Sequence, residues 1–410
     1  MASTSPGPRS SRPWVVPVLS GNVLLTGVVV GTGTVTVTRD TFDPRSVAVT
    51  VTADQTSNVA VTLSRVTTAV GGVLSTRVPA GGISADGKTL EFSIQVVVVD
   101  ENSTAVTGLT SGAFNLQPCT PSAATAAADC VVGPDGFDAA YTVLGPGSAP
   151  AFEEIPGGIA QPYAAALMFD QSKSIIRNDP TDARLFSAKE FLGSLGGSDR
   201  ASLAAFAIDV QAENGTALIP ETPVTIYPVG NPAFVADGTV FFPTLDALTT
   251  QEGGGTPLYE ALCQVMDFTA ASAPAGLRQA AVVFTDGQDD APNTAGFECT
   301  EIDDAIAKST ATGVDIFTIG LSGEVDGLAL AALADGGGGA FLFAEDTSQL
   351  ITIYGSLGNL LSGSLTTYRL TYRITTDVAN AFQPGRAVLG SLAVNTGAAS
   401  VRLPFIVRIF

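Results

Sequence analysis

Three patterns of hydrophobic and polar positions follow one another along the chain. Residues 14–66 are rich in Val and Thr and alternate with period two, as in GTGTVTVTRD and SVAVTVTADQTSNVAVTL. Such alternation, broken by Gly, Asp and Asn, predicts antiparallel strands with one face in water. Residues 67–157 contain LEFSIQVVVVDENSTAVTGLTSGAFNL, which predicts a long strand, a polar turn and a further strand. This second block indicates a β-sandwich module.

The pattern changes after the Pro- and Gly-rich stretch GPGSAPAFEEIPGG, which is typical of a linker. Uninterrupted apolar runs such as YAAALMF, AAVVF and VDIFTIG then alternate with helical segments such as DARLFSAKEFLGSL and EIDDAIAKSTATG. Apolar strands between amphipathic helices indicate a parallel sheet that is covered on both faces. We therefore expect a doubly wound, Rossmann-like α/β domain over residues 158–362.

Alternation returns in the last segment, residues 363–410, with TTYRLTYRIT and SLAVNTGAASVRLPFIVRIF. We hypothesise that these strands complete the β-sandwich of residues 67–157, which would make the α/β domain an insertion. Residues 1–13 are rich in Ser, Pro and Arg and predict a disordered start. The predicted fold is multidomain, α/β plus all-β, with the doubly wound domain inserted between or following β-sandwich modules.

Composition narrows the classes of function. Acidic residues outnumber basic ones 39 to 19, and the resulting formal net charge of −20 argues against nucleic acid and anionic membranes as partners. The chain of 410 residues contains no histidine. This removes Ser-His-Asp and Cys-His catalysis, His-ligated zinc and the commonest general base. We therefore do not expect a conventional hydrolase.

The number and spacing of the cysteines indicate whether the protein resides in an oxidising cellular compartment. Cys119, Cys130, Cys263 and Cys299 are an even number at wide spacing without a C-x-x-C pair. This favours disulfides between neighbours, Cys119 with Cys130 and Cys263 with Cys299, in an oxidising compartment, while four buried free thiols are the alternative. Residues 14–38 carry no charge, but Pro and Gly interrupt them, so they predict strands rather than a membrane helix. No clear signal peptide precedes them.

Polar oxygens follow the ends of two predicted strands. Asp170, Ser172 and Ser174 alternate in FDQSKS, and Asp286 follows AAVVF in FTDG. Thr256 comes after three glycines in GGGTPL, at a predicted helix start. Because ligands bind beyond the carboxyl ends of the strands in an open α/β sheet, we expect these side chains to converge. Oxygen ligands without nitrogen or sulfur select a hard cation such as Mg²⁺, which leaves a position for a carboxylate from another molecule.

These three motifs together resemble the metal-ion-dependent adhesion site (MIDAS) of von Willebrand factor A-type (VWA) domains. The resemblance extends over residues 158–362, including the order of strands and helices. It implies that the Ser172 and Ser174 hydroxyls bind the ion directly, and that Asp170 and Asp286 bind it directly or through water. Thr256 would bind the ion directly in one conformation of the domain and through water in another. It also implies Mg²⁺, with Mn²⁺ or Ca²⁺ as alternatives, and a protein partner whose Asp or Glu completes the shell.

The flanking segments resemble other modules. VVVVDENSTAVTGLTSGAFNL is similar to the Ig-like segment that precedes A-type domains in secreted bacterial proteins. VTVTADQTSNVAVTL is similar to the last strands of transthyretin-like or carboxypeptidase-regulatory-like modules. These resemblances imply a bacterial protein that is secreted or held at the cell surface.

The leading hypothesis is a non-enzymatic, metal-dependent protein-binding or adhesion protein. The alternative is a secreted structural or envelope scaffold whose VWA domain mediates self-assembly. An enzyme would need Asp289, Asp290 or Glu252 as its general base, because histidine is absent. We expect Asp289 and Asp290 to form a solvated loop face instead.

Overall fold

The computed structural model describes residues 30–39, 42–53, 70–100, 103–118, 131–132, 137–144, 150–208, 223–286, 289–290, 296–321, 327–344, 347–396 and 400–409. The chain divides into two compact units, Met1–Ser64 and Arg65–Phe410. The predicted disordered start and the cysteines Cys119 and Cys130 lie outside the described residues.

The first unit contains an antiparallel hairpin of β1 (Gly31–Arg39) and β2 (Phe42–Val51). Its register places Gly31 opposite Val51. The alternating Val and Thr residues therefore do form strands here, as their period predicts. Most of the segment that resembles a transthyretin-like module, residues 54–63, lies outside the described part of the chain.

The second unit is built on a mixed sheet whose α/β part has the order β12-β11-β10-β13-β14-β15. Neighbouring strands in this part run parallel, except that β12 is antiparallel to β11. The first strand in sequence, β10, lies in the middle, so the strand order reverses between β10 and β13. The strands are β10 (Tyr163–Asp170), β11 (Arg200–Phe206), β12 (Val224–Tyr227), β13 (Arg278–Thr285), β14 (Asp315–Leu321) and β15 (Gly338–Ala344).

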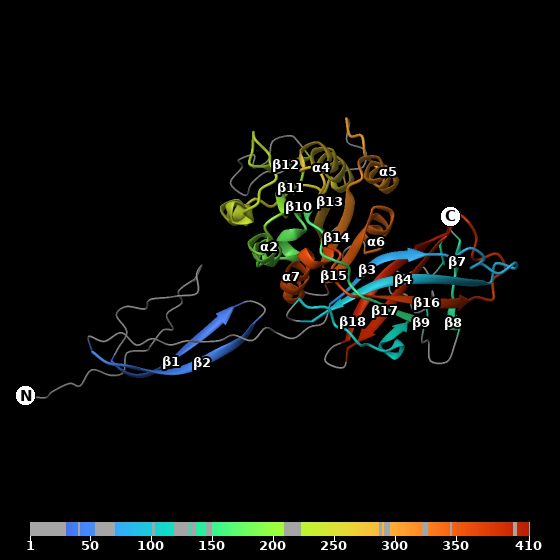
Figure 1. The fold of residues 1–410 in the computed structure, drawn as a ribbon, viewed down its shortest axis with the longest axis horizontal. Coiled ribbons are helices and arrows are strands. Elements are labelled where there is room, and N and C mark those ends of the chain that lie inside the picture. Colours follow the sequence, from blue (N-terminus) through green and yellow to red (C-terminus); the bar gives the residue numbers. More distant parts are fainter. Residues whose placement is uncertain are drawn as a thin grey trace, which may run out of the picture. The chain divides into compact units, whose positions relative to one another are not determined.

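Helices cover both faces of these strands (Figure 1). Leu167 and Phe169 of β10 pack in one core with α1, α2, α3 and α7, whereas Ala166 and Met168 pack in the other with α4, α5 and α6. Every residue of β10 is buried, which explains its unbroken apolar run. The helices are α1 (Ile175–Asn178), α2 (Ala183–Gly193), α3 (Phe242–Leu248), α4 (Leu258–Ser272), α5 (Ile302–Thr312), α6 (Gly327–Gly336) and α7 (Leu350–Leu361).

The same sheet continues beyond β15 into the β-rich part. β3 pairs antiparallel with β15, β4 with β3, and β16 with β4, and both β8 and β9 pair with β16. The strand that follows α7 therefore lies beside a strand that precedes β10. The added strands are β3 (Val70–Arg77), β4 (Thr89–Val99), β8 (Thr142–Leu144), β9 (Ala151–Ile155) and β16 (Thr367–Thr375).

A second, smaller sheet packs against this extension. Alternate residues of β4, such as Phe92, and of β18, such as Phe405, belong to one buried cluster, and their ring centroids lie 5.7 Å apart. The alternation that predicted half-buried strands therefore reflects two sheets that share a core. The smaller sheet contains β5 (Phe114–Leu116), β6 (Val131–Val132), β7 (Asp138–Ala139), β17 (Ala387–Asn395) and β18 (Ser400–Arg408).

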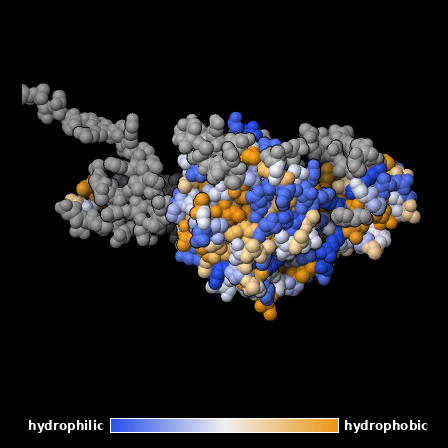
Figure 2. Space-filling view, turned by 90° about the horizontal axis from the view of Figure 1, so that it is seen from above, coloured by the Kyte–Doolittle hydropathy of each residue, from blue (hydrophilic) through white to orange (hydrophobic). Residues whose placement is uncertain are grey.

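Single-turn 3₁₀ helices complete the described secondary structure, at Ser111–Ala113, Gly238–Phe241 and Thr347–Gln349. On the face that Figure 2 presents, apolar side chains lie in small groups among hydrophilic ones. Ile159, Ile176 and Val229 are among the large apolar side chains exposed to water. Scattered apolar side chains of this kind are normal on a protein surface.

Candidate metal centre

Two buried carboxylates lie where the strand order reverses. Asp170 is the last residue of β10, and Asp286 directly follows β13. The two strands pair in parallel, with Phe169 opposite Phe284, so both carboxylates leave the sheet at the same edge. Asp170 is 0% exposed and Asp286 is 1% exposed. This edge is the place where open α/β sheets bind their ligands.

Hydroxyl groups connect the two carboxylates. The Oγ atoms of Ser172 and Ser174 lie 3.0 Å apart, and Ser174 Oγ donates to Asp286 Oδ1 over 2.9 Å. Asp170 Oδ1 accepts a hydrogen bond from the Ser172 backbone N–H over 2.7 Å. Asp170 Oδ2 accepts one from the Thr285 hydroxyl over 2.6 Å. The structure thus brings four of the predicted site residues, Asp170, Ser172, Ser174 and Asp286, into one network.

Backbone hydrogen bonds join the loop that carries Thr256 to the loop Asp170–Ser174, which we call the first loop. Gly253 N–H donates to Gln171 O over 2.8 Å, and Lys173 N–H donates to Gly254 O over 3.1 Å. Gly254 has a φ of 72°, which favours glycine. A Cβ on Gly255 would come within 2.7 Å of an Asp290 carboxylate oxygen. Thr256 itself is buried at the end of this loop, beside the first turn of α4.

Burial perturbs the pKa values of both carboxylates. Burial, and then the charge of Asp286, raise the pKa of Asp170 from 3.8 to about 6, against the lowering effect of its hydrogen bonds. Burial also raises the pKa of Asp286, although hydrogen bonds from Ser174 and Asn178 oppose this. Two neighbouring buried carboxylates that resist ionisation favour a bound cation, because a positive charge would stabilise their ionised forms.

Asp286 and Asp170 each have a neighbour that the sequence motifs do not include. Asn178 Nδ2 donates to Asp286 Oδ2 over 2.8 Å, and the Thr285 hydroxyl holds Asp170 as described above. Asn178 lies four residues after Ser174 on α1, so both side chains are on one helix face. That spacing was a usable signal for Asn178. Thr285 gave no comparable signal, because it reads as an ordinary strand residue.

Asp289 and Asp290 have a more specific role than the expected solvated face. Asp289 Oδ1 accepts a hydrogen bond from the Tyr259 N–H over 3.2 Å, and Asp290 Oδ1 accepts one from the Thr256 N–H. Asp290 N–H in turn donates to Thr256 O over 3.1 Å. Their carboxylates therefore hold the start of α4 and the Thr256 loop in place, although Asp290 is exposed.

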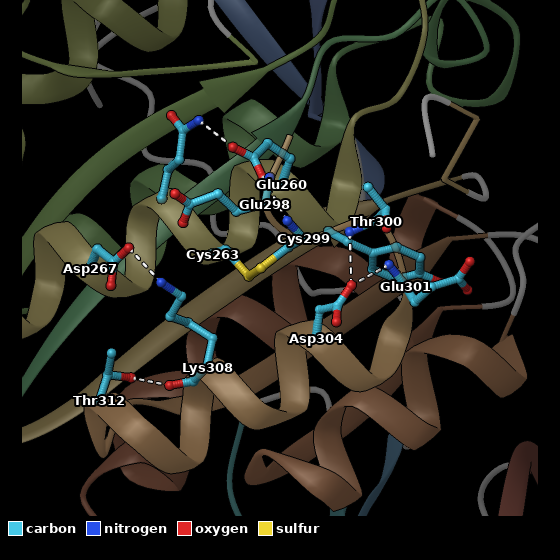
Figure 3. The surroundings of a disulfide bond; sticks show 12 residues. Glu260, Cys263, Asp267, Glu298, Cys299, Thr300, Glu301, Asp304, Lys308 and Thr312 are labelled. Atoms are coloured by element: carbon cyan, nitrogen blue, oxygen red, sulfur yellow. Dashed lines mark hydrogen bonds and ion pairs between the residues drawn. A yellow bond between two sulfur atoms is a disulfide. The ribbon is translucent and has the colours of Figure 1, made fainter. Parts of the chain in front are cut away.

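A disulfide joins the two segments on the α4 side of the site. Cys263 on α4 is bonded to Cys299, which follows Asp286 along the chain (Figure 3). Glu260 Oε2 accepts hydrogen bonds from the backbone N–H groups of Glu298 and Cys299, each over 2.9 Å. The segment that leaves the Asp286 strand is therefore attached to the helix that begins after Thr256. This is the neighbouring pair expected from the spacing of the cysteines.

The donor set suits a hard cation. Within the described part of the chain, no three or more Cys, Asp and Glu side chains gather in a metal-binding group. The side chains that do meet at the strand ends supply carboxylate and hydroxyl oxygens, which are the ligands of Mg²⁺, Mn²⁺ and Ca²⁺ rather than of soft metals. The residues present therefore fit a hard divalent cation.

Comparison with known proteins identifies the α/β part. Residues 166–356 match the von Willebrand factor type A domain. This part of the chain thus corresponds to a VWA domain, an α/β Rossmann-like fold that generally serves in interactions. No curated protein sequence matches the chain.

Solved structures resemble the chain at low identity. One is von Willebrand factor type A from Catenulispora acidiphila, with 12% identity over 63% of this chain and 74% of that chain, and a TM-score of 0.39. A second is proximal thread matrix protein 1 from the mussel byssus with a zinc-occupied MIDAS motif. It has 16% identity over 51% of this chain and 49% of that chain, and a TM-score of 0.36. A third is the pilus adhesin SpaC from Lactobacillus rhamnosus GG, with 12% identity over 81% of this chain and 56% of that chain, and a TM-score of 0.38. The chain spans about half the length of the last two. Likenesses this weak carry no argument about function.

Among the described helices, none has the length and apolarity that a membrane crossing needs.

Proposed function

We propose that this protein is a non-enzymatic, metal-dependent protein-binding protein. In this proposal Asp170, Ser172, Ser174 and Asp286, together with Thr256, hold Mg²⁺. The bound ion supplies an electrophilic position that accepts an Asp or Glu carboxylate from a partner. The observation that carries the proposal is the continuous network of two buried carboxylates and two hydroxyls at the reversal point of the sheet.

The spacing of the oxygens fits the ligand spacing of a hard divalent cation such as Mg²⁺. Neighbouring ligands of an octahedral Mg²⁺, at about 2.0–2.1 Å from the ion, are about 2.9 Å from one another. Ser172 Oγ and Ser174 Oγ are 3.0 Å apart, and Ser174 Oγ and Asp286 Oδ1 are 2.9 Å apart. Neighbouring oxygens in the pentagonal plane of a Ca²⁺ site, at about 2.3–2.6 Å from the ion, are about 2.7–3.1 Å apart, so the same spacing also accepts Ca²⁺. Mn²⁺ and Ca²⁺ are therefore both alternatives to Mg²⁺.

The carboxylates around the site favour binding over catalysis. A hydrolase would need a general base near the ion. Asp289 and Asp290 accept backbone hydrogen bonds from the α4 loop, and Glu252 forms an ion pair with Arg184 over 2.7 Å. Each of these three candidate bases thus forms a hydrogen bond or an ion pair that stabilises a loop of the site. This supports a site that captures a partner rather than one that activates water.

The outer surface of the first loop and of α1 supports an acidic partner. Lys173 of the loop and Ile176 and Arg177 of α1 are exposed, close in sequence to the buried proposed ligands Ser172 and Asp170. The whole chain carries a formal net charge of −20, so two exposed basic side chains on one short segment are a local exception. They would attract the acidic segment that the ion binds. The exposed Ile176 would contact an apolar side chain of that segment.

The proposed setting is outside the cell, and the proposed source is bacterial. A disulfide between Cys263 and Cys299 is typical of an oxidising compartment. We propose that the β-sheets of residues 67–157 and 363–410 form one Ig-like sandwich that supports the VWA domain. The pairing of β16 with β4 and the shared buried cluster support this arrangement.

Calorimetric titration of Mg²⁺, Mn²⁺ and Ca²⁺ into metal-stripped protein tests the ion site. Saturable binding at one site is expected for the wild type and is expected to be lost in Ser172→Ala/Ser174→Ala. A matched control is Ser362→Ala/Ser364→Ala, whose hydroxyls also lie 3.0 Å apart but follow α7. The control should bind like the wild type. Equal binding by both double variants would refute the proposed ligands.

Capture of a partner is a separate measurement. Immobilised Asp- and Glu-containing peptides should retain the protein in Mg²⁺ and release it in EDTA. The alternative function, a self-assembling scaffold, predicts instead an oligomer that sedimentation detects in Mg²⁺ and that EDTA dissolves. Retention without oligomer formation would decide for capture, and oligomer formation without retention would decide for the scaffold.

A further inference from the structure

A fully buried arginine lies behind the ion site. Arg184 belongs to α2 and is 0% exposed. Its Nη1 donates to Asp179 Oδ2 over 3.0 Å and to Asp182 Oδ1 over 3.2 Å. Its Nη2 donates to Gln171 Oε1 and, over 2.7 Å, to Glu252 Oε1. A guanidinium therefore sits inside the domain among three carboxylates and an amide.

Two of these partners belong to the two loops that carry the proposed ligands. Gln171 lies between Asp170 and Ser172 in the first loop and is itself 0% exposed. Its Nε2 donates to Leu248 O over 2.8 Å and to Gln251 O over 3.2 Å. Its side chain thus also contacts the segment that leads into the second loop.

Glu252 begins that second loop, which ends at Thr256. One nitrogen, Nη2 of Arg184, consequently touches the side chains of both loops.

The other terminal nitrogen of the guanidinium, Nη1, binds the residue that follows α1. Asp179 follows α1 directly, and its carboxylate also accepts hydrogen bonds from the N–H groups of Ala183 and Arg184, over 2.8 and 3.0 Å. Asp179 is next to Asn178, which donates to the proposed ligand Asp286. Arg184 therefore contacts the Asp170–Ser174 segment itself, through Gln171, and the residue that follows α1, Asp179.

The geometry needs arginine rather than any cation. A guanidinium is planar and presents its donors in a rigid fork, so its two terminal nitrogens can hold separate partners at once. A lysine ammonium is a compact point charge on a flexible stem and does not reproduce this fork. Burying a charge is costly unless its partners are in place, so this network strongly specifies where the loops lie.

We propose that Arg184 is a positioning residue of the ion site, which locks the Asp170–Ser174 loop and the Glu252–Thr256 loop into the relative placement that lets both face one cation. This inference rests on the proposed function, because it assigns Arg184 a role in the affinity for the ion. A purely structural arginine would stabilise the fold and leave the affinity of the folded protein for the ion unchanged.

The test compares Mg²⁺ affinity with stability in Arg184→Lys and Glu252→Gln. Calorimetry gives the Mg²⁺ affinity of each folded variant, and urea unfolding in EDTA gives its stability without metal. Groups that orient metal ligands typically contribute about 10–100-fold to metal affinity. We expect a loss in this range for Arg184→Lys. A smaller loss is expected for Glu252→Gln, which keeps an oxygen acceptor but removes the charge.

Arg278→Lys is the matched control. Arg278 Nε donates to Asp315 Oδ2 over 2.7 Å at the start of β13, the end of that strand remote from Asp286. The control should lose some stability and keep the wild-type Mg²⁺ affinity. Wild-type affinity in folded Arg184→Lys and in Glu252→Gln would overturn the inference while leaving the proposed function intact.

Should Arg184→Lys fail to fold, Glu252→Gln alone decides, because it leaves the arginine in place. Weakened Mg²⁺ binding at unchanged folding would support the positioning role, and unchanged binding would overturn it. Absence of Mg²⁺ binding in the wild type would overturn the proposed function and this inference together. The two failures are therefore distinguishable by the wild-type titration.

Discussion

Asp170→Asn should make the metal-free protein more stable at neutral pH. Asp170 is fully buried, and burial and the neighbouring charge of Asp286 raise its pKa from 3.8 to about 6. The folded protein therefore binds a proton at Asp170 more tightly than the unfolded chain does. For such a group the free energy of unfolding falls as the pH rises from about 4 to about 6, and it stays lower above that range.

The magnitude follows from the two pKa values. The difference between 3.8 and about 6 corresponds to about 3 kcal/mol, at ~1.4 kcal/mol for each pKa unit. Asparagine is neutral and so avoids this cost at pH 7. Its Oδ1 can still accept from the Ser172 N–H, and its Nδ2 can donate to the Thr285 hydroxyl, which can act as an acceptor. About 3 kcal/mol is the upper limit, because the rearranged hydrogen bonds are weaker than those to a charged carboxylate.

Urea unfolding in EDTA at a series of pH values measures this effect. The stability advantage of Asp170→Asn should be present at pH 7 and should disappear below about pH 4, where Asp170 is protonated in both the folded and unfolded states. Added Mg²⁺ should stabilise the wild type by mass action and leave the variant unchanged. A variant that is less stable than the wild type in EDTA at pH 7 would refute the electrostatic reasoning.

A control for this prediction lies at the opposite end of β10. Asp199 also accepts backbone hydrogen bonds, from the N–H groups of Tyr163 and Gly196, but it is remote from the proposed ion. Asp199→Asn should not stabilise the metal-free protein, since it weakens these hydrogen bonds without relieving a buried charge. A gain similar to that of Asp170→Asn would point to a general effect of making the net charge less negative.

Three further predictions concern the ion, the partner and the disulfide. Because the pKa of Asp170 is raised to about 6 without metal, protons compete with the ion, and calorimetry should find Mg²⁺ affinity roughly tenfold lower at pH 5 than at pH 7. A pH-independent affinity would contradict this. Lys173→Glu should weaken capture of acidic peptides several-fold, most strongly at low salt, without weakening Mg²⁺ binding. The control is Lys88→Glu, at the residue that directly precedes β4. An equal loss of peptide capture in both variants would point to net charge alone. Cys263→Ala/Cys299→Ala opens a loop with a sequence separation of 36 residues. It should lower the free energy of unfolding by about 4 kcal/mol on the chain-entropy estimate. Urea unfolding tests this, and an unchanged midpoint would exclude the bridge as a stabilising element.

The sequence by itself determined the class of the central domain and the candidate ligands. The buried strands of a parallel sheet need apolar side chains on both faces, so runs such as YAAALMF are visible without any knowledge of their neighbours. D-x-S-x-S, the Thr after a Gly run and the Asp after a strand are likewise local patterns. Each depends on residues within a few positions of one another, and local conformation is what such spacing reports.

Tertiary structure alone decided which strands are neighbours and which side chains meet behind the site. The pairing of β15 with β3, which joins the α/β strands to the β-rich part, relates segments far apart in the chain, and no local period encodes it. Arg184 looks like an ordinary surface charge in the sequence, yet it is fully buried and lies 2.7 Å from the partly buried Glu252. Their contact depends on the backbone hydrogen bonds that hold the Asp170–Ser174 loop beside the Glu252–Thr256 loop, which is distant along the chain. A hydrogen-bond network between loops is therefore a property of the assembled fold, whereas each ligand motif is a property of its own short segment.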